Sequence, residues 1–234
     1  MRTCLPALLF AITLSAPAGA ATRNFGITSF ERIRVDGPFR VSLATGVAPF
    51  ARATGSPAAL DRVAIEVQGN TLVVHNNLDS WGGWPGQDPG SVEISVGTHD
   101  LNAAWLNGSG SLAIDRIKGL SFDLSIQGSG AGQIGTVGVD QLNVSVVGTA
   151  SARLAGAAST LTAVVRGIST LDAAGLTTKD ATIGADGAAT IDASVSNAAK
   201  VDATGPATVR LTGHPACTLR VSGSSSVSGC RTSQ

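Results

Sequence analysis

The sequence predicts an all-β fold, a single elongated parallel β-solenoid with coils of about 18–20 residues. Two observations support this prediction. Glycine recurs at intervals of 20, 20, 19, 20, 18 and 18 residues, and these marker glycines are Gly108, Gly128, Gly148, Gly167, Gly187, Gly205 and Gly223. Apolar and polar residues alternate around them, which is the pattern of strands with one buried face. A helix is excluded because the apolar residues are two positions apart and a central glycine costs a helix about 1 kcal/mol.

The composition agrees with many short, closely packed strands. The chain has 234 residues, of which 43% are hydrophobic, 14% are charged and 29 are glycine. It is too apolar for a disordered chain and too polar for a bundle of membrane helices. Sixteen basic residues balance sixteen acidic ones. No cationic field therefore attracts anionic lipid or nucleic acid, and a nucleic-acid partner is not expected.

Residues 1–20 have the features of a secretory signal peptide. Arg2 precedes an apolar stretch from Cys4 to Leu14, and small residues follow as far as Ala20. The apolar stretch has about half the length of a membrane-spanning helix. We therefore expect cleavage near Ala20, no membrane span, and a mature protein that is secreted or resides in the periplasm or cell envelope.

Residues 21–104 are expected to form irregular, wider coils and a cap. Alternation from 33 to 43 predicts one strand bent at a glycine, and the segments 63–67 and 92–96 predict further strands. The segment 75–90 is rich in glycine, proline, asparagine and aspartate. We expect an exposed loop there.

Residues 105–230 are expected to form the regular coils, followed by a tail at 231–234. The inward positions of one coil are Phe122, Leu124, Ile126, Gly128, Gly130, Gly132 and Ile134. The same register returns at Leu142, Val144, Val146, Gly148, Ala150, Ala152 and Leu154, and at Val201, Ala203, Gly205, Ala207, Val209 and Leu211. The marker glycine shares the core-facing parity, and we expect it to bend the strand at a corner without crowding the interior. A single coil cannot stabilise itself, so the ends of the stack need protection.

Two cysteines remain after the expected cleavage, Cys217 and Cys230. An even number of cysteines in an exported protein predicts a disulfide, which contributes about 3 kcal/mol for a loop of this size. The alternative is a pair of free thiols. A metal site would need two more ligands, and only His214 is close in sequence.

Four segments carry a resemblance to a known family. They are Ile-x-Val-x-Gly-Pro-Phe-x-Val-x-Leu at 33–43, Gly-Asn-Thr-Leu-Val-Val at 69–74, Leu-Asn-Gly-Ser-Gly at 106–110 and Ile-Gln-Gly-Ser-Gly at 126–130. Over residues 30–230 the chain resembles the auto-transporter adhesin head GIN domain family of bacterial envelope proteins. The resemblance implies an all-β, coil-like, exported protein, and it supplies no catalytic residues.

Outward positions of successive coils form predicted ladders. Five residues after the first six marker glycines stand Ala113, Gln133, Arg153, Asp172, Asp192 and Arg210. We interpret these as a solvated charge ladder, in which each ion pair contributes less than about 1 kcal/mol. The alternative is that Asp172 and Asp192, about 5 Å apart on adjacent coils, form an acid pair or a calcium site. Further predicted neighbours are Arg166 with Asp186, and the ladder Thr162, Thr182, Lys200 and Thr218.

No motif for catalysis, metal binding or cofactor binding is found. His75, His99 and His214 are scattered and lack acidic residues at metal-binding spacing. The sequence has no Gly-x-Ser-x-Gly elbow, His-Glu-x-x-His helix or phosphate-binding loop. We therefore expect no catalytic residue, no metal ligand and no cofactor.

Trp81 and Trp84 are the candidate ligand contacts. Both lie in an otherwise polar stretch, Trp-Gly-Gly-Trp-Pro. Exposed indoles can stack on sugar rings or anchor a protein partner. The alternative is that both fold back to cover an open end of the solenoid. Trp105 begins a repeat strand and is expected to pack locally.

These observations predict an exported, non-enzymatic β-solenoid with a structural or adhesive role in the bacterial cell envelope. A glycan or an envelope protein is the expected partner, and the oligomeric state stays open. The alternative is a β-helix polysaccharide lyase or hydrolase that uses Asp172 and Asp192. This alternative requires a cleft lined by several charged residues, whereas the charges of this chain are few and largely paired with one another.

Overall fold

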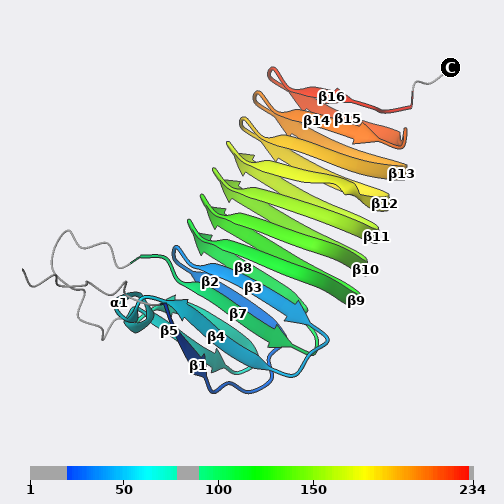
Figure 1. The fold of residues 1–234 in the computed structure, drawn as a ribbon. Helices are drawn as coiled ribbons and strands as arrows, with labels where there is room; N and C mark the ends of the chain where they lie inside the picture. Colours follow the sequence, from blue (N-terminus) through cyan, green and yellow to red (C-terminus); the bar gives the residue numbers. More distant parts are fainter. Residues whose placement is uncertain (1–19, 78–89, 232–234) are drawn as a thin grey trace, which may run out of the picture.

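A computed structural model describes residues 20–77 and 90–231. The described residues form one 16-stranded sheet wound into a rod of about six turns, with a single short helix at its amino-terminal end (Figure 1). No helix within these ranges is long and apolar enough to cross a membrane. The predicted all-β solenoid is therefore confirmed.

The body of the rod is built around five long parallel strands of 15–18 residues, each of which continues around most of one coil, with shorter parallel strands at both ends of this stack. Each long strand pairs with strands one coil earlier and one coil later, so the sequence period sets the register. The strands of the body are β8 (Ala103–Gly108), β9 (Ser111–Gly128), β10 (Ala131–Gly148), β11 (Ser151–Gly167), β12 (Thr170–Asp186), β13 (Thr190–Thr204), β14 (Thr208–Thr212), β15 (Ala216–Ser222) and β16 (Ser226–Ser228).

A narrow apolar interior runs along the rod. Leu124 lies opposite Val144 in the parallel pairing of β9 with β10, and both are buried. Val201, four coils along the same column, is buried as well. Inward side chains therefore stack on one another, and each coil covers the apolar surface of its neighbours. The predicted buried positions are confirmed, apart from the marker glycines.

The marker glycines lie at a corner, as predicted, but their predicted core-facing direction is wrong. None of them is buried. All have positive φ, and a Cβ added to Gly148 would lie only 2.4 Å from the carbonyl oxygen of Gly128. The corner thus needs glycine because the backbones of adjacent coils approach closely there. Gly37 extends this column, because a Cβ on Gly108 would lie 3.3 Å from the Gly37 carbonyl oxygen.

The amino-terminal coils do not stack in chain order. The predicted bent strand at 33–43 is two strands, β2 (Arg32–Asp36) and β3 (Arg40–Thr45), on either side of Gly37. β2 lies between β8 and β6 (Thr71–Asn76), and β3 lies between β9 and β7 (Glu93–Thr98). The coil made by β6 and β7 therefore stacks beneath the coil made by β2 and β3, although it follows in sequence.

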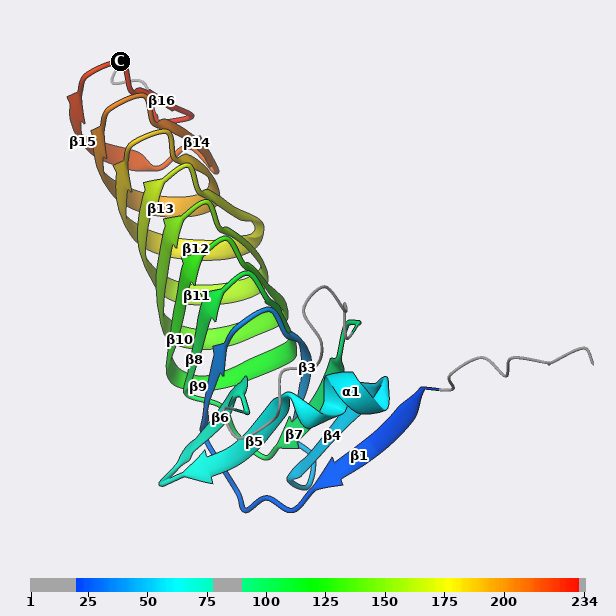
Figure 2. The same ribbon diagram turned by 90° about the vertical axis from the view of Figure 1, so that its left-hand side faces the viewer.

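Antiparallel strands and the helix cover this end of the rod (Figure 2). β4 (Phe50–Gly55) pairs with β7, β1 (Ala21–Phe25) pairs with β4, and β5 (Val63–Gln68) pairs with β6. The helix α1 (Pro57–Asp61) begins at Ser56, whose hydroxyl accepts a hydrogen bond from the backbone N–H of Ala59 at 3.1 Å. Leu60 of this helix is buried in the core.

Several predictions concern residues at or beyond the limits of the described ranges. Strand β6 continues through His75 and Asn76, so the strand runs two residues into the expected loop 75–90. Trp81, Trp84 and the expected signal peptide lie outside the described residues. At the other end, the predicted disulfide between Cys217 and Cys230 is confirmed, with a Cα–Cα distance of 5.7 Å. It joins β15 to the residues just after β16.

Candidate binding face

One outward column of side chains runs along the whole length of the sheet. We call the surface around it the binding face. The parallel and antiparallel registers place these residues side by side, in the order Asn24, Arg52, Ser95, Ser42, Ala113, Gln133, Arg153, Asp172, Asp192, Arg210 and Ser228. The predicted ladder from Ala113 to Arg210 is confirmed, and the structure extends it in both directions.

The upper part of the binding face is a charge ladder. Arg153 Nε lies 3.0 Å from Asp172 Oδ2, and Arg210 Nη1 lies 3.3 Å from Asp192 Oδ1. Asp172 and Asp192 are direct neighbours on adjacent coils. Each carboxylate has an arginine of its own, and all four side chains contact solvent. This arrangement is that of a surface charge ladder, whose pairs contribute little to stability, rather than of two carboxyl groups sharing one proton.

The lower part of the binding face contains a groove of about 490 Å³. Its floor is low because the column carries only small side chains there, those of Ser95, Ser42 and Ala113. Two longer side chains, those of Phe50 and Gln133, also line it. We call it the Phe50 groove, and it is lined by Ser42, Leu43, Ala44, Phe50, Ser95, Val96, Ala113, Ile114, Asp115, Gln133 and Gly135.

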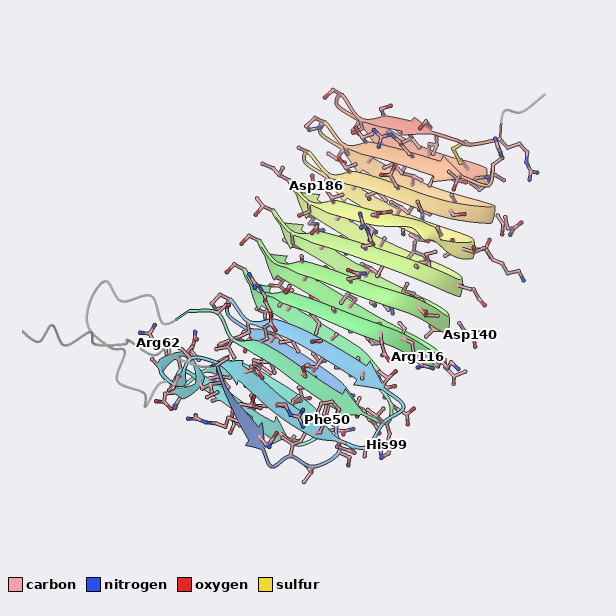
Figure 3. The ribbon with its side chains drawn as sticks, in the orientation of Figure 1. Phe50, Arg62, His99, Arg116, Asp140 and Asp186 are labelled. Carbon is pink, nitrogen blue, oxygen red and sulfur yellow. A yellow bond between two sulfur atoms is a disulfide. The ribbon has the colours of Figure 1, made fainter. Side chains whose placement is uncertain are left out.

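Phe50 is the large aromatic side chain of this groove, and it is 40% exposed. Strand β4 buries Ala51 and Ala53, so its alternation directs Phe50 outward. The ring packs on the opposing strand at Gly97, where an added Cβ would lie 2.3 Å from Phe50 Cε1. Figure 3 shows Phe50 near the amino-terminal end of the rod. The sequence reasoning missed Phe50, although its alternation with Ala51 and Ala53 placed it outside the core.

Asp115 supplies an ordered carboxylate at the rim of the groove. Its Oδ1 accepts hydrogen bonds from the backbone N–H groups of Thr45 and Arg116, at 3.0 and 2.6 Å. The Thr45 hydroxyl lies 3.3 Å from the same oxygen and donates to the Arg116 carbonyl at 2.8 Å. Its Oδ2 lies 3.8 Å from Arg116 Nε. The carboxylate is thus held in one orientation, and no sequence motif singled it out.

A second shallow groove of about 390 Å³ continues along the same face toward Asp172. Its lining includes Ala113, Gln133 and Arg153 of the column together with the small residues Ser111, Ala131 and Ser151. These small residues are register neighbours, so they form a low strip beside the column. The binding face therefore combines an aromatic end, a polar strip and a charged end.

The other predicted ladders lie where the period placed them. Thr162, Thr182, Lys200 and Thr218 are successive neighbours. Arg166 and Asp186 are also in register, but no ion pair joins them among the described contacts. Asp186 lies at the margin of the rod in Figure 3. None of these residues lines the Phe50 groove.

The histidines do not form a site. Glu66 accepts a hydrogen bond from Gln68 Nε2 at 2.7 Å and lies 3.4 Å from His75 Nε2. Hydrogen bonds from Gln68 and then from His75 hold the pKa of the Glu66 carboxyl below its usual range. His99 lies beside Arg116 and Lys118 in a separate pocket of about 250 Å³. Within residues 20–77 and 90–231, no cluster of three metal-ligating side chains is present. Trp105 is half-buried on β8.

Solved structures with the same fold come from Bacteroides and Parabacteroides species. One described as a putative adhesin from Bacteroides fragilis has a TM-score of 0.80 at 17% identity, covering 90% of this chain and 96% of that chain. One described as a putative lipid binding protein from Parabacteroides distasonis has a TM-score of 0.70 at 19% identity, covering 89% and 95%. One described as a putative adhesin from Parabacteroides merdae has a TM-score of 0.64 at 17% identity, covering 89% and 95%. At these identities the likeness shows the shared fold.

No curated protein matches the chain in sequence. A family model does match, over residues 29–215, which include the amino-terminal cap from β2 onward and the coils of the body. That model is described as "Putative auto-transporter adhesin, head GIN domain". The match covers most of the chain, and it includes the Gly37 corner, the marker glycines up to Gly205 and the Phe50 groove. The chain therefore belongs to the auto-transporter adhesin head GIN domain family.

Proposed function

We propose that this protein is an exported, non-enzymatic adhesive rod that binds a saccharide in the Phe50 groove. The observation that carries the proposal is an exposed aromatic ring beside a low floor of small residues and hydroxyls. Phe50 supplies the ring, and Ser42 and Ser95 supply the hydroxyls. The family description and the disulfide support export and a role in adhesion.

The groove has the chemistry that a sugar ring needs. Sugar rings present C–H groups on one face, and these pack well on an aromatic ring. Their hydroxyls need donors and acceptors at the edges, which Ser42, Ser95 and the ordered carboxylate of Asp115 provide. The groove volume of about 490 Å³ falls within the usual range for small-ligand sites, about 300–1,000 Å³. The shallow floor also leaves room for a chain to continue along the second groove.

A non-enzymatic role is supported by the pairing of the acids. A glycosidase needs two carboxyl groups facing one substrate, with one of them available as an acid. Asp172 and Asp192 instead each contact an arginine in an exposed ladder. Incubation with uronate-containing polysaccharides tests the enzymatic alternative. New unsaturated or reducing ends that depend on either aspartate would overturn the non-enzymatic assignment.

A glycan array tests the binding proposal directly. Wild-type mature protein is compared with Phe50→Ala, and with Leu120→Ala as a matched control. Leu120 is 79% exposed and lies outside both grooves. We expect Phe50→Ala to weaken the strongest signals by roughly tenfold, because an aromatic stacking contact contributes about 0.5–1.5 kcal/mol beyond the area it buries. Leu120→Ala should retain the wild-type profile.

Two results would contradict the proposal. The first is a Phe50→Ala profile that matches wild type. The second is an array without signal combined with binding to phospholipid vesicles, which would assign the groove to lipid. The proposal that Trp81 and Trp84 contact the ligand is tested on the same array with the double variant Trp81→Ala/Trp84→Ala. An unchanged profile for that variant would remove these two residues from the site and leave the groove.

A further inference from the structure

The last coil of the rod exposes side chains that belong to the interior. In the parallel register, Leu219 continues the inward column of Val201, and Val221 continues that of Ala203. Val201 and Ala203 are 1% and 0% exposed, whereas Leu219 and Val221 are 44% and 46% exposed. The difference arises because no further coil covers β15 among the described residues. The carboxyl-terminal end thus presents the cross-section of an apolar core.

The backbone of this coil is also open on one side. Among residues 20–77 and 90–231, β15 pairs only with β13, and β16 pairs only with β14. The free edge of β15 therefore offers N–H and C=O groups to another strand. Natural edges of this kind are usually blocked by charged side chains, prolines or bulges within the strand. Residues 216–222 contain no proline and no bulge, and Arg220 is their one charged residue.

The opposite end of the rod is closed and polar. The edge strand β1 presents Thr22, Arg23 and Asn24, which are all exposed. Arg23 donates hydrogen bonds to the Asp61 carboxylate and to the Leu60 carbonyl. Within the part of the chain that the structure describes, neither edge strand at this end, β1 or β5, has an exposed large apolar side chain like Leu219 and Val221. A head-to-tail filament is therefore a poor match, whereas two carboxyl-terminal ends are chemically alike.

We propose that the carboxyl-terminal coil is a dimerisation surface, on which a second copy of this chain docks end to end through antiparallel β15 strands. A two-fold axis through Leu219 places Leu219 opposite Leu219 of the second copy. Val221 then lies opposite Cys217 of the second copy, so the inward columns meet. Arg220 lies opposite Thr218 of the second copy, so the two guanidinium groups are not direct cross-strand neighbours. The surface is self-complementary, as a closed dimer requires.

The disulfide holds the terminal coil in an ordered conformation before it docks. It closes a loop from Cys217, on β15, to Cys230, beyond β16. The backbone N–H of Arg231 donates a hydrogen bond to the Pro215 carbonyl at 2.9 Å, which ties the end of the coil to its beginning. A terminal coil that is already ordered loses less conformational entropy when it docks. Because each copy contributes one coil, the interface lies at the small end of the usual range, and we expect micromolar affinity.

Sedimentation equilibrium of the mature protein, from about 1 to 200 μM, tests the proposal. We expect wild type to convert from monomer to dimer across this range. Leu219→Arg places a charge at the two-fold axis and should weaken association at least tenfold. Leu120→Arg, an equally large change at an exposed leucine away from the end, should associate like wild type. Circular dichroism confirms that each variant is folded.

Hydrogen exchange of wild type at the lowest and highest concentrations gives a second measurement that needs no variant. The amides of β15 that face away from β13 should gain protection at the highest concentration, and those of β1 should not. Wild type that stays monomeric at about 200 μM would overturn the proposal. So would Leu219→Arg that dimerises like wild type, species larger than a dimer, or protection gained at β1. None of these readouts depends on saccharide binding.

Discussion

Gly148 offers a sharp test of how the coils are held together. Its φ is +110°, and a Cβ at this position would lie 2.4 Å from the carbonyl oxygen of Gly128 and 3.2 Å from its carbonyl carbon. Gly148→Ala therefore introduces two separate costs. The alanine must occupy a backbone conformation that L-residues avoid, and its methyl group must push two backbones apart.

The expected loss in the free energy of unfolding is the sum of these two costs. A non-glycine residue in such a conformation costs about 1–3 kcal/mol. Forcing an extra carbon into a packed site costs about another 1–3 kcal/mol. We therefore expect the free energy of unfolding to fall by about 2–6 kcal/mol, a large part of the 5–15 kcal/mol typical of folded domains. The loss exceeds the roughly 1 kcal/mol that a mean substitution costs.

Urea unfolding followed by circular dichroism measures this loss, and Gly184→Ala is the matched control. Gly184 lies in β12 with no positive φ, and the nearest atom to an added Cβ is 3.9 Å away. That variant should be neutral or more stable by about 0.4–1 kcal/mol, because alanine restricts the unfolded chain. With a slope of about 2 kcal/mol/M, Gly148→Ala should lower the midpoint by about 1–3 M. Equal midpoints for the two variants would refute the corner argument.

Three further predictions concern the carboxyl-terminal coil, the binding face and the amino-terminal cap. Reduction of the disulfide, or the double variant Cys217→Ser/Cys230→Ser, should lower the free energy of unfolding by about 3 kcal/mol. Amide hydrogen exchange should become faster in the last coil before it does so elsewhere, and unchanged exchange in that coil would contradict this prediction. A double-mutant cycle on Arg153 and Asp172 should give a coupling below about 1 kcal/mol that vanishes at 1 M salt, and a salt-independent coupling would contradict the solvated ladder. The Glu66 carboxyl should titrate in NMR with a midpoint below 4.5. Its contribution to the stability of the folded state is therefore complete above that pH and is lost on acidification through the folded-state pKa. A midpoint of 4.5 or higher would be inconsistent with its hydrogen bonds.

The repeat could be predicted from the sequence because a solenoid converts a period into geometry. Residues one period apart become neighbours, and alternation decides which side chains enter the interior. For this reason the contact between Arg153 and Asp172 could be anticipated without coordinates, and so could the buried column of Leu124 and Val144. The cysteine pair followed from an even count and short spacing. The resemblance of the glycine-centred segments likewise indicated the family.

The features of the binding site depend on contacts that no period encodes. Phe50 packs on Gly97 only because β4 runs antiparallel to β7, and this pairing joins two strands that are separated in sequence by α1, β5 and β6. The coil of β6 and β7 follows that of β2 and β3 in sequence. It nevertheless pairs with the amino-terminal side of that coil, β6 with β2 and β7 with β3. The direction of the marker glycines was also decided by tertiary structure, since the approach of two backbones at the corner, rather than strand parity, sets where those residues point. Sequence patterns are local or periodic, whereas these contacts join distant segments at single points, and only the folded chain brings them together.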